Sequence, residues 1–342
     1  MPVTDRDLDL GRSPAPRRRA ASGRVSMAMV AARAGVSGQT VSRVVNDSPR
    51  VDPATRERVE KAMADLGYRP HRAARALRTG RSHTIGLVVT TLATVGNSRM
   101  LQATAEAAAE RGYALTVVTA SGGVADAFER LAEQEVDGAI VLNEASAQVP
   151  SAARPAGLRL VVVDAPAGAG LDGVHSDHVG GAAAATAHLL ALGHPTVHHL
   201  AGPADSFAAA ERERGWRETL EAAGIAPPPV VRGDWSADAG FDAGGALAAA
   251  SAVFCANDQM ALGLLRALAE SGRRVPEDVS VIGFDDVPDA ANYRPPLTTI
   301  RQDFTALARR AFDALVAGIE GADTSSGDAV IPTTLVERAS TR

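Results

Sequence analysis

The spacing of apolar residues changes near residue 84 of this 342-residue chain. From there on, short apolar runs alternate with Ala- and Leu-rich helical segments that end at glycines, namely Gly112, Gly193, Gly224 and Gly272. The apolar runs predict strands at residues 85–89, 115–118, 139–142, 160–163, 197–201, 253–256 and 279–283. Such strands are buried on both faces, as in parallel sheets covered by helices. Because about 250 residues with this many strands fit two sheets better than one, we predict doubly wound parallel sheets in two α/β subdomains.

The segment before this alternation predicts a pair of short helices. Ser26 can cap the first helix, which ends at Gly35. Ser37 can cap the second, which lies in the stretch "GVSGQTVSRVVN" (35–46). Three valines form one narrow apolar edge of this second helix, and its other sides carry small or polar residues. The second helix therefore has one side suited to packing and the others free for contact with a partner.

A third helix follows, with Asp52 as its cap and Pro53 at its first position. Its apolar residues recur at i, i+3, i+4 and i+7 before Gly67 ends it. Two helices joined by a turn at Gly35, with a third helix beneath them, are the plan of a helix-turn-helix unit. In that plan the polar sides of the second helix enter the major groove of DNA.

The charge distribution supports a nucleic-acid partner for the front of the chain only. Residues 1–82 hold 17 Lys and Arg against 8 Asp and Glu, whereas the other residues hold 18 against 32. A basic front on an acidic body indicates that the front meets a polyanion. We predict a disordered basic leader, a helix-turn-helix domain, a hinge helix or linker and an effector-binding and dimerisation domain, at residues 1–22, 23–69, 70–82 and 83–342.

Two of these segments leave alternatives open. The three arginines at 17–19 in the leader add non-specific attraction to phosphates, or the leader is inert. The stretch "RPHRAARALRTGRS" (69–82) has helical propensity but little apolar surface. It therefore either folds on binding and fixes the distance between two domains, or it is an ordinary charged linker.

Several classes of protein are disfavoured. The chain has no apolar run long enough for a transmembrane helix and no secretory signal at its N-terminus. The single cysteine, Cys255, fits a reducing compartment and a core position. No nucleophile elbow, Walker loop or zinc signature is present, and His198 and His199 point to opposite faces of a strand. We therefore expect a cytoplasmic protein that is no enzyme, holds no cofactor and no metal, and has no membrane partner.

Polar residues just after predicted strands are the candidate ligand contacts, because ligands of doubly wound sheets bind beyond the carboxyl ends of the strands. These residues are Asp164, Asn257, Asp258, Asp285 and Asp286. Asp258 is expected to cap the helix that begins at Gln259, and Asp258 and Asp286 to orient loops rather than touch a ligand.

Long segments of the chain resemble the LacI/GalR family of bacterial transcription regulators. They are "GVSGQTVSRVVN", "SPRVDPATRERVEKAMADLGYRPHRAARALRTGRSHTIGLV" and "FCANDQMALGLLRALAESGRRVPEDVSVIGFDDVPDAANYRPPLTTIRQDF", and the likeness extends from Val25 to Glu337. It implies a homodimer that binds a near-palindromic, double-stranded operator DNA, and a body of periplasmic-binding-protein type. The implied N-subdomain comprises residues 83–175 and 304–330, and the C-subdomain residues 176–302 and 331–338.

The resemblance also implies which residues meet DNA. Gly38, Gln39 and Arg43 match base-reading positions, and Gln and Arg suit adenine and guanine respectively. Leu77 matches a wedge that enters the minor groove from the hinge helix. The full set of expected DNA contacts is Ser37, Gly38, Gln39, Thr40, Ser42, Arg43, Asn46, Ala74 and Leu77. Two departures from the family pattern, Met29 and His71, are expected to weaken binding without abolishing it.

A small sugar effector is implied in the cleft between the subdomains. Polar residues that match the family's hydroxyl-binding positions are accompanied by Trp235, which matches an aromatic that packs on a sugar face, whereas Trp216 is expected to be structural. The expected effector contacts are Asp164, Ser206, Arg212, Trp235, Asn257, Asp285, Gln302 and Phe304. "LAGP", "GDWSADAGF", "ANDQMALG" and "PPLTTIRQDF" look especially like the galactoside-responsive members, which suggests a galactoside.

Four alternatives stay open at this point. The regulator can respond to another sugar or use a corepressor, or the chain can be a sugar-binding protein without gene regulation. A sugar-processing enzyme would use Asp164 and Asp285 as an acid/base pair.

Compared with the family, the chain is a few residues shorter after "AGFDAGGALAAASAVF", so the helix there must end early or its loop be very tight. The tail to Arg342 lacks leucine heptads, so the resemblance implies a dimer.

Overall fold

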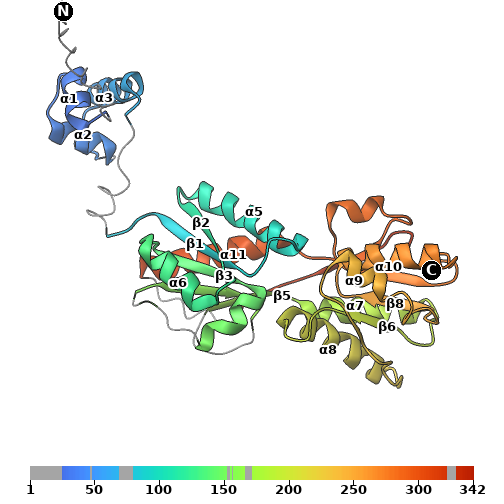
Figure 1. Cartoon of the computed structure of the whole chain (residues 1–342). Coiled ribbons are helices and arrows are strands. Elements are labelled where there is room, and N and C mark those ends of the chain that lie inside the picture. Colours follow the sequence, from blue (N-terminus) through green and yellow to red (C-terminus); the bar gives the residue numbers. More distant parts are fainter. Residues whose placement is uncertain are drawn as a thin grey trace, which may run out of the picture. The chain divides into compact units, whose positions relative to one another are not determined.

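The computed structural model describes residues 25–46, 48–68, 80–151, 155, 157–165, 172–321 and 329–342. The chain divides between residues 79 and 80 into two compact units, which we call the head and the body (Figure 1). The predicted leader, and the hinge positions Ala74 and Leu77, lie outside the described residues. Among the described residues, no helix combines the length and hydropathy that crossing a bilayer requires.

The described residues of the head form three helices, α1 (Met27–Ala34), α2 (Gly38–Val45) and α3 (Pro53–Leu66). Each N-cap side chain predicted from the sequence accepts a hydrogen bond from the first turn of its helix: Ser26 from Met29, Ser37 from Thr40 and Asp52 from Thr55. The glycines after α1 and α3 are left-handed and end these two helices.

The head has its own small core, to which all three helices contribute. Its buried apolar residues are Val30, Ala31, Val41, Val44, Val59, Ala62 and Tyr68. Two of the three valines on the apolar edge of α2 are buried there, and the third, Val45, packs at its margin. The other sides of α2 therefore remain available, as the sequence pattern predicts.

The body has two lobes, each built on a six-stranded sheet (Figure 1). The sheet of the N-lobe has the order β11-β5-β4-β3-β1-β2, and all its neighbouring strands are parallel. Its elements are β1 (Thr84–Val89), α5 (Val95–Glu110), β2 (Ala114–Thr119), α6 (Val124–Glu133), β3 (Gly138–Leu142), the 3-10 helix η1 (Asn143–Ser151), β4 (Arg159–Val163), β5 (Asp172–Ser176), α11 (Phe304–Glu320) and β11 (Ala329–Ile331).

The sheet of the C-lobe has the order β12-β10-β9-β8-β6-β7. Its strands are parallel except for the edge strand β12, which pairs with β10 in antiparallel fashion. Its elements are α7 (His178–Ala191), β6 (His198–Ala201), α8 (Phe207–Ala222), β7 (Val231–Arg232), α9 (Ala237–Asp242), β8 (Ala252–Cys255), α10 (Asp258–Glu270), β9 (Ser280–Asp285), the 3-10 helix η2 (Pro288–Asn292), β10 (Thr298–Arg301) and β12 (Thr334–Val336).

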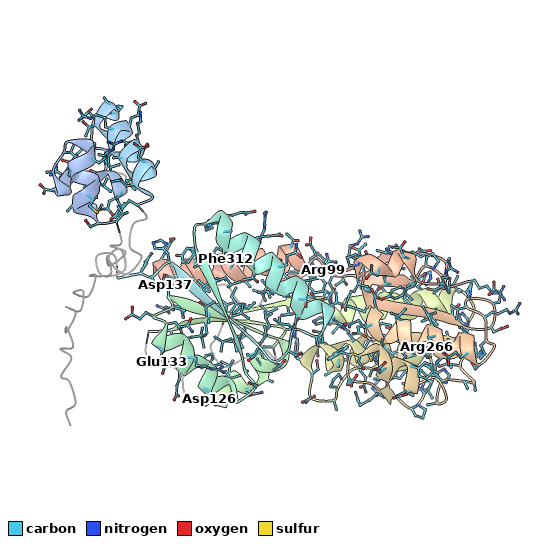
Figure 2. The ribbon with its side chains drawn as sticks, turned by 45° about the horizontal axis from the view of Figure 1, so that its top comes forward. Arg99, Asp126, Glu133, Asp137, Arg266 and Phe312 are labelled. Atoms are coloured by element: carbon cyan, nitrogen blue, oxygen red, sulfur yellow. The ribbon has the colours of Figure 1, made fainter. Side chains whose placement is uncertain are left out.

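Helices cover both faces of each sheet, so each lobe has two layers of core. In the N-lobe, α5 and α11 pack on one face, where Phe312 of α11 is buried, and α6 packs on the other (Figure 2). In the C-lobe, α10 packs on one face and α7 and α8 on the other. The predicted doubly wound fold class is therefore confirmed, with one antiparallel edge strand that the sequence pattern did not indicate.

In the described residues the chain passes between the lobes three times. The crossings run from β5 to α7, from β10 to α11 and from β11 to β12. Asp164 follows β4 in the N-lobe, while Asp285 ends β9 in the C-lobe. Because ligands of such sheets bind beyond the carboxyl ends of the strands, the junction of the lobes is where a site is expected.

Candidate functional site

A cavity of about 500 Å³, including its open mouth, lies between the two lobes. All eight residues that the resemblance assigns to the effector line this cavity. Five further residues line it as well: Thr94, Gly96, Met100, Asn143 and Ala208. The N-lobe contributes polar groups and the Phe304 ring, and the C-lobe contributes Arg212 and Trp235, so both lobes can hold one ligand at the same time.

Asp285 and Arg212 form the charged pair on the C-lobe side. Arg212 projects from α8, and its Nη1 lies 3.6 Å from Oδ1 of Asp285. The amide of Gln302 donates to the same oxygen at 2.7 Å. Burial raises the pKa of Asp285 above its ordinary value, although Arg212 and Gln302 oppose the shift. The three side chains hold each other in place at the cavity wall.

Asp164 supplies the carboxylate on the N-lobe side. Its Oδ1 accepts hydrogen bonds from the ring of His178, at 2.9 Å, and from the main-chain N–H of Ser176, at 3.2 Å. Burial opposes ionisation of this carboxyl, but the interactions with His178 and Ser176 outweigh it and lower its pKa. Asp164 is therefore an ionised acceptor at the cavity.

The guanidinium of Arg212 is packed between aromatic rings. Its Cζ lies 3.9 Å from the centroid of the Phe284 ring and 5.5 Å from that of Trp235. Its Nη1 also donates to the main-chain carbonyl of Ala256. A guanidinium stacked in this way presents its donors in a fixed plane.

Trp235 is held by its backbone and by the glycine beside its ring. Its carbonyl accepts a hydrogen bond of 3.0 Å from Nδ2 of Asn257. A Cβ placed on Gly202 would meet the Trp235 ring at 2.4 Å, so only glycine lets the ring lie this close to the end of β6. Trp235 itself is 9% exposed and lines the cavity, in keeping with an aromatic platform for a ligand.

The start of α10 differs from the sequence expectation. Asn257, not Asp258, caps the helix, because Oδ1 of Asn257 accepts from the N–H of Met260 at 2.9 Å. Asp258 is the first helical residue and accepts from Thr299 Oγ1 at 2.6 Å and from the N–H of Val287 at 2.9 Å. Asp258 thus orients the loop after β9, and it is absent from the cavity lining, as is Asp286.

The remaining three predicted contacts sit at the starts of helices or beside them. Ser206 caps α8 and accepts from Ala209, and Phe304 begins α11 with the guanidinium of Arg99 5.4 Å from its ring centroid. Within the described part of the chain, Oε1 of Gln302 is buried and accepts no hydrogen bond. A ligand hydroxyl is the kind of donor that this oxygen lacks.

Backbone strain is concentrated at the cavity. Four of its lining residues have left-handed backbones: Asn143, Asp164, Trp235 and Asp285, with φ of 47°, 50°, 75° and 116°. Such conformations cost of order 1–3 kcal/mol each and persist where the surroundings over-determine them. Asn143 and Asp164 directly follow strands and Asp285 ends one, so these three strained residues lie at the carboxyl ends of strands.

The chain after Trp235 is short, and helix packing accommodates this. Helix α9 ends at Asp242 and turns lead on to β8, so the helix ends early. A Cβ on Gly240 would lie 2.1 Å from the carbonyl of Met260, and one on Gly263 would lie 1.8 Å from that of Ala237. These two glycines allow α9 and α10 to touch through their backbones, next to the residues that hold Trp235.

The side chains that line the cavity can bind hydroxyl groups and cover apolar faces of a ligand. Carboxylates accept from hydroxyls, an arginine and amides donate to them, and aromatic rings cover apolar faces. Among the described residues, no group of three or more His, Cys, Asp or Glu side chains is placed to hold a metal ion. His198 and His199 lie on opposite faces of β6, and only His199 is fully buried.

The exposed side of α2 presents the predicted base-reading residues. Gly38, Gln39 and Arg43 are exposed, as is the cap residue Ser37. Ser37 Oγ lies 3.0 Å from Thr40 Oγ1. Asn46 donates to Ser42 Oγ at 3.3 Å, so part of the predicted polar set also stabilises the ends of α2. Gln39 and Arg43 are one helical turn apart and share a face.

Besides the five further lining residues, the sequence reasoning also missed His178, which supports the site from outside the cavity lining. It is 2% exposed and bonds both Asp164 and Arg212 from behind the cavity wall. His178 follows β5 (Asp172–Ser176), and its position after a strand could have marked it as a candidate. That strand is short and of mixed polarity, so no apolar run in the sequence indicates it.

The head and the body match two different family descriptions. Residues 26–71 match "Bacterial regulatory proteins, lacI family", and residues 186–341 match a "Periplasmic binding protein-like domain". The Lactose operon repressor of Escherichia coli (strain K12) is 38% identical over 328 residues, which cover 93% of this chain and 91% of the relative. The HTH-type transcriptional regulator CelR of Thermobifida fusca is 38% identical over 336 residues, which cover 93% and 98%.

Solved structures give the same result. The lac repressor dimer bound to operator and the anti-inducer ONPF superposes with a TM-score of 0.84 at 36% identity, over 93% of this chain and 99% of that one. The complex of the transcriptional regulator CelR with cellobiose superposes with a TM-score of 0.70 at 36% identity, over 93% and 100% of the two chains.

Proposed function

The chain belongs to the lacI family of bacterial regulatory proteins, as a DNA-binding regulator with an effector-binding domain, and we propose that it is a homodimeric repressor released from its operator by a small galactoside. The observation that carries the effector part is the cavity between the lobes, which gathers all eight expected contact residues. Members of this family are not enzymes, so Asp164 and Asp285 serve as hydroxyl acceptors and not as an acid/base pair.

The head supplies DNA recognition in this proposal. Gln39 and Arg43 read base edges in the major groove, while Ser37, Thr40, Ser42 and Asn46 contact phosphates and Gly38 admits a close approach of the backbone. Ala74 and Leu77 of the hinge contact the minor groove at the operator centre. Operator DNA places the site of action in the cytoplasm, which the single cysteine also suits.

The effector acts by holding the two lobes in one relative position. A ligand that contacts Arg212 and Trp235 on one side and Asp164 on the other favours the lobe arrangement that best closes around it. That arrangement disfavours the spacing of two heads on the operator. A 100-fold loss of operator affinity corresponds to a coupling free energy of about 2.7 kcal/mol.

The choice of a galactoside rests on the lactose operon repressor, which is 38% identical and covers 93% of this chain. A β-glucoside such as cellobiose is the second candidate, because the regulator in the CelR–cellobiose complex is 36% identical and its structure covers the same share of the chain. A corepressor would bind in the same cavity but would raise the operator affinity instead of lowering it.

Fluorescence anisotropy of a labelled duplex tests the proposal. The duplex comes from upstream of a neighbouring sugar gene, and binding is measured alone and with lactose, isopropyl thiogalactoside or cellobiose. Tight binding relieved by a galactoside supports the whole proposal. Relief by cellobiose alone would mean that the effector is a β-glucoside and not a galactoside. Tighter operator binding with a sugar would mean that the sugar acts as a corepressor. No binding to any duplex from that region contradicts the operator assignment.

A further inference from the structure

His178 connects two charged residues of the cavity without lining the cavity itself. It is the first residue of α7, directly after the crossing from β5, and its side chain is 1% exposed. Its Nε2 lies 2.9 Å from Oδ1 of Asp164, and its Nδ1 lies 3.3 Å from Nε of Arg212. One imidazole therefore joins the carboxylate of the N-lobe to the guanidinium of the C-lobe.

The partners of His178 determine its protonation state. The Nε of arginine is always a donor, so Nδ1 of His178 must accept and carries no hydrogen. The carboxylate of Asp164 is an acceptor, so Nε2 must carry the hydrogen and donate it. The ring is consequently the neutral tautomer with its hydrogen on Nε2, and each of its two nitrogens is used.

Aromatic rings fix the plane of this imidazole. The ring of Phe207 meets it edge-on at a centroid distance of 6.3 Å, and the ring of Phe284 lies 6.0 Å away. Phe284 also carries the guanidinium of Arg212 on its face. The imidazole and the guanidinium are thus held by the same ring, and neither can turn without disturbing the other.

We propose that His178 is a positioning residue for effector recognition: its neutral ring, as donor to Asp164 and acceptor from Arg212, fixes the carboxylate and the guanidinium that meet the ligand. This inference rests on the proposed function, because it deepens the role of the same cavity. A ring protonated on Nδ1 as well would place an N–H against the N–H of Arg212. The charged groups that face the ring are Asp164, Arg212 and, next to Arg212, Asp285.

Three substitutions of His178 separate its two hydrogen bonds from its bulk. His178→Leu fills space but neither donates nor accepts, whereas His178→Gln and His178→Asn carry an amide that does both. His188→Asn is the matched control, since His188 lies on the same helix and bonds Thr341 away from the cavity. Each full-length variant is assayed for lactose, isopropyl thiogalactoside and cellobiose by calorimetry, for operator binding without sugar and for thermal unfolding.

We expect His178→Leu to weaken sugar binding about 10- to 100-fold, as is typical when hydrogen bonds to charged groups are lost. The better of the two amide variants recovers most of this loss, and His188→Asn binds sugar and operator like the wild type. A purely structural role would instead lower the unfolding temperature of all three variants alike, with no rescue by an amide. Unchanged sugar affinity in His178→Leu overturns the proposal.

A ligand-free measurement separates this inference from the proposed function. Long-range ¹H–¹⁵N spectra of the full chain, with the His178 signal assigned by its loss in His178→Asn, report the tautomer directly. A neutral ring protonated on Nε2 supports the two hydrogen bonds of His178. They are also supported if the Arg212 Nε–H exchanges slowly in the wild type and in His188→Asn but fast in His178→Leu. An Nδ1-protonated or charged ring overturns the proposal. If the wild type binds none of the three sugars, the effector class fails and these spectra alone decide the role of His178.

Discussion

Asn257 ties the start of α10 to the loop that carries Trp235. Its Nδ2 donates to the Trp235 carbonyl at 3.0 Å, and its Oδ1 accepts from the N–H of Met260 at 2.9 Å. One buried side chain thereby satisfies a helix N-terminus and a strained residue with φ of 75°. The position of the tryptophan ring at the cavity depends on this double contact.

Replacing Asn257 by alanine and by aspartate separates the two contacts. Asn257→Ala loses both, and we expect it to cost about 1–2 kcal/mol of stability, the usual range for a lost N-cap. Asn257→Asp keeps an oxygen for Met260 but cannot donate to Trp235, so it should retain the cap and still weaken sugar binding. Urea unfolding and calorimetry measure the two effects, and equal sugar affinity in wild type and Asn257→Asp would show that the tether to Trp235 is unimportant.

Gly202→Ala should disturb the cavity without touching a ligand. The new Cβ would overlap the Trp235 ring, so the ring must shift from its place at the cavity. Overpacking of this kind costs about 1–3 kcal/mol, and we expect at least part of it as lost sugar affinity. Gly245→Ala is the control, because a Cβ there meets nothing within 4 Å. Tryptophan emission reports the ring displacement, and an unshifted spectrum with wild-type affinity would contradict it.

Gln259 forms a hydrogen bond between the lobes. Its Oε1 accepts from the N–H of Val95, at the start of α5, at 3.0 Å. Gln259→Ala removes this bond, whose net contribution is about 0.5–1.5 kcal/mol. Gln259→Glu keeps an acceptor. We expect faster hydrogen exchange of the Val95 amide in the alanine variant. In the same variant, the sugar concentration that releases the protein from its operator should shift by about 2- to 10-fold. Identical exchange in both variants would mean that the lobes are held elsewhere.

Arg43 and Gln39 are expected to read bases. Arg43→Ala should lose about 1–3 kcal/mol of discrimination between bases at one operator position. For duplexes changed at other positions, the affinities should keep their wild-type ratios to one another. Arg33→Ala is a matched control, since Arg33 is exposed on α1 and pairs with Asp65 at 3.3 Å. Competition anisotropy with a set of single-base duplexes distinguishes the two. A uniform loss across all duplexes would identify Arg43 as a phosphate contact instead.

His199 should make the C-lobe acid-sensitive. Burial lowers its pKa from 6.5 to about 4, because the ring is stacked on Phe254 and Trp216. Its Nδ1–H donates to the Phe254 carbonyl, and its Nε2 has no hydrogen-bond partner among the residues that the structure describes. Above pH 6.5 the ring is neutral in both folded and unfolded chains, and its contribution is fully present. As the pH falls toward 4, the unfolded chain takes up a proton that the folded ring refuses, and stability is lost.

The loss amounts to about 3 kcal/mol once the pH is below both values. His199→Asn keeps a donor for the Phe254 carbonyl and cannot titrate. Its free energy of unfolding should therefore vary less between pH 7 and pH 4 than that of the wild type, with His188→Asn following the wild type. Urea unfolding across this range checks the slope, and parallel curves for wild type and His199→Asn would rule out His199 as the group responsible.

Sequence patterns predicted the elements whose signals are local. The caps Ser26, Ser37 and Asp52 each hold the first turn of a helix, and these bonds lie within a few residues along the chain. All seven strands expected from apolar runs are present. The five other strands, β5, β7, β10, β11 and β12, lie next to crossings or at sheet edges, where short and partly polar stretches give no period to follow.

Periodicity and capping signals in the sequence were enough to predict the helices of the head and the two-sheet body, because burial and capping leave periodic or short-range marks, whereas most of the expected ligand contacts followed from the resemblance to the family. Tertiary structure alone decided that Asn257 rather than its neighbour caps α10, that glycines 240 and 263 bring α9 onto α10, and that His178 joins Asp164 to Arg212. Besides its local cap, Asn257 bonds the carbonyl of Trp235, and the glycine and His178 contacts likewise join residues from different elements. Their energies depend on distances that exist only after these elements have packed together.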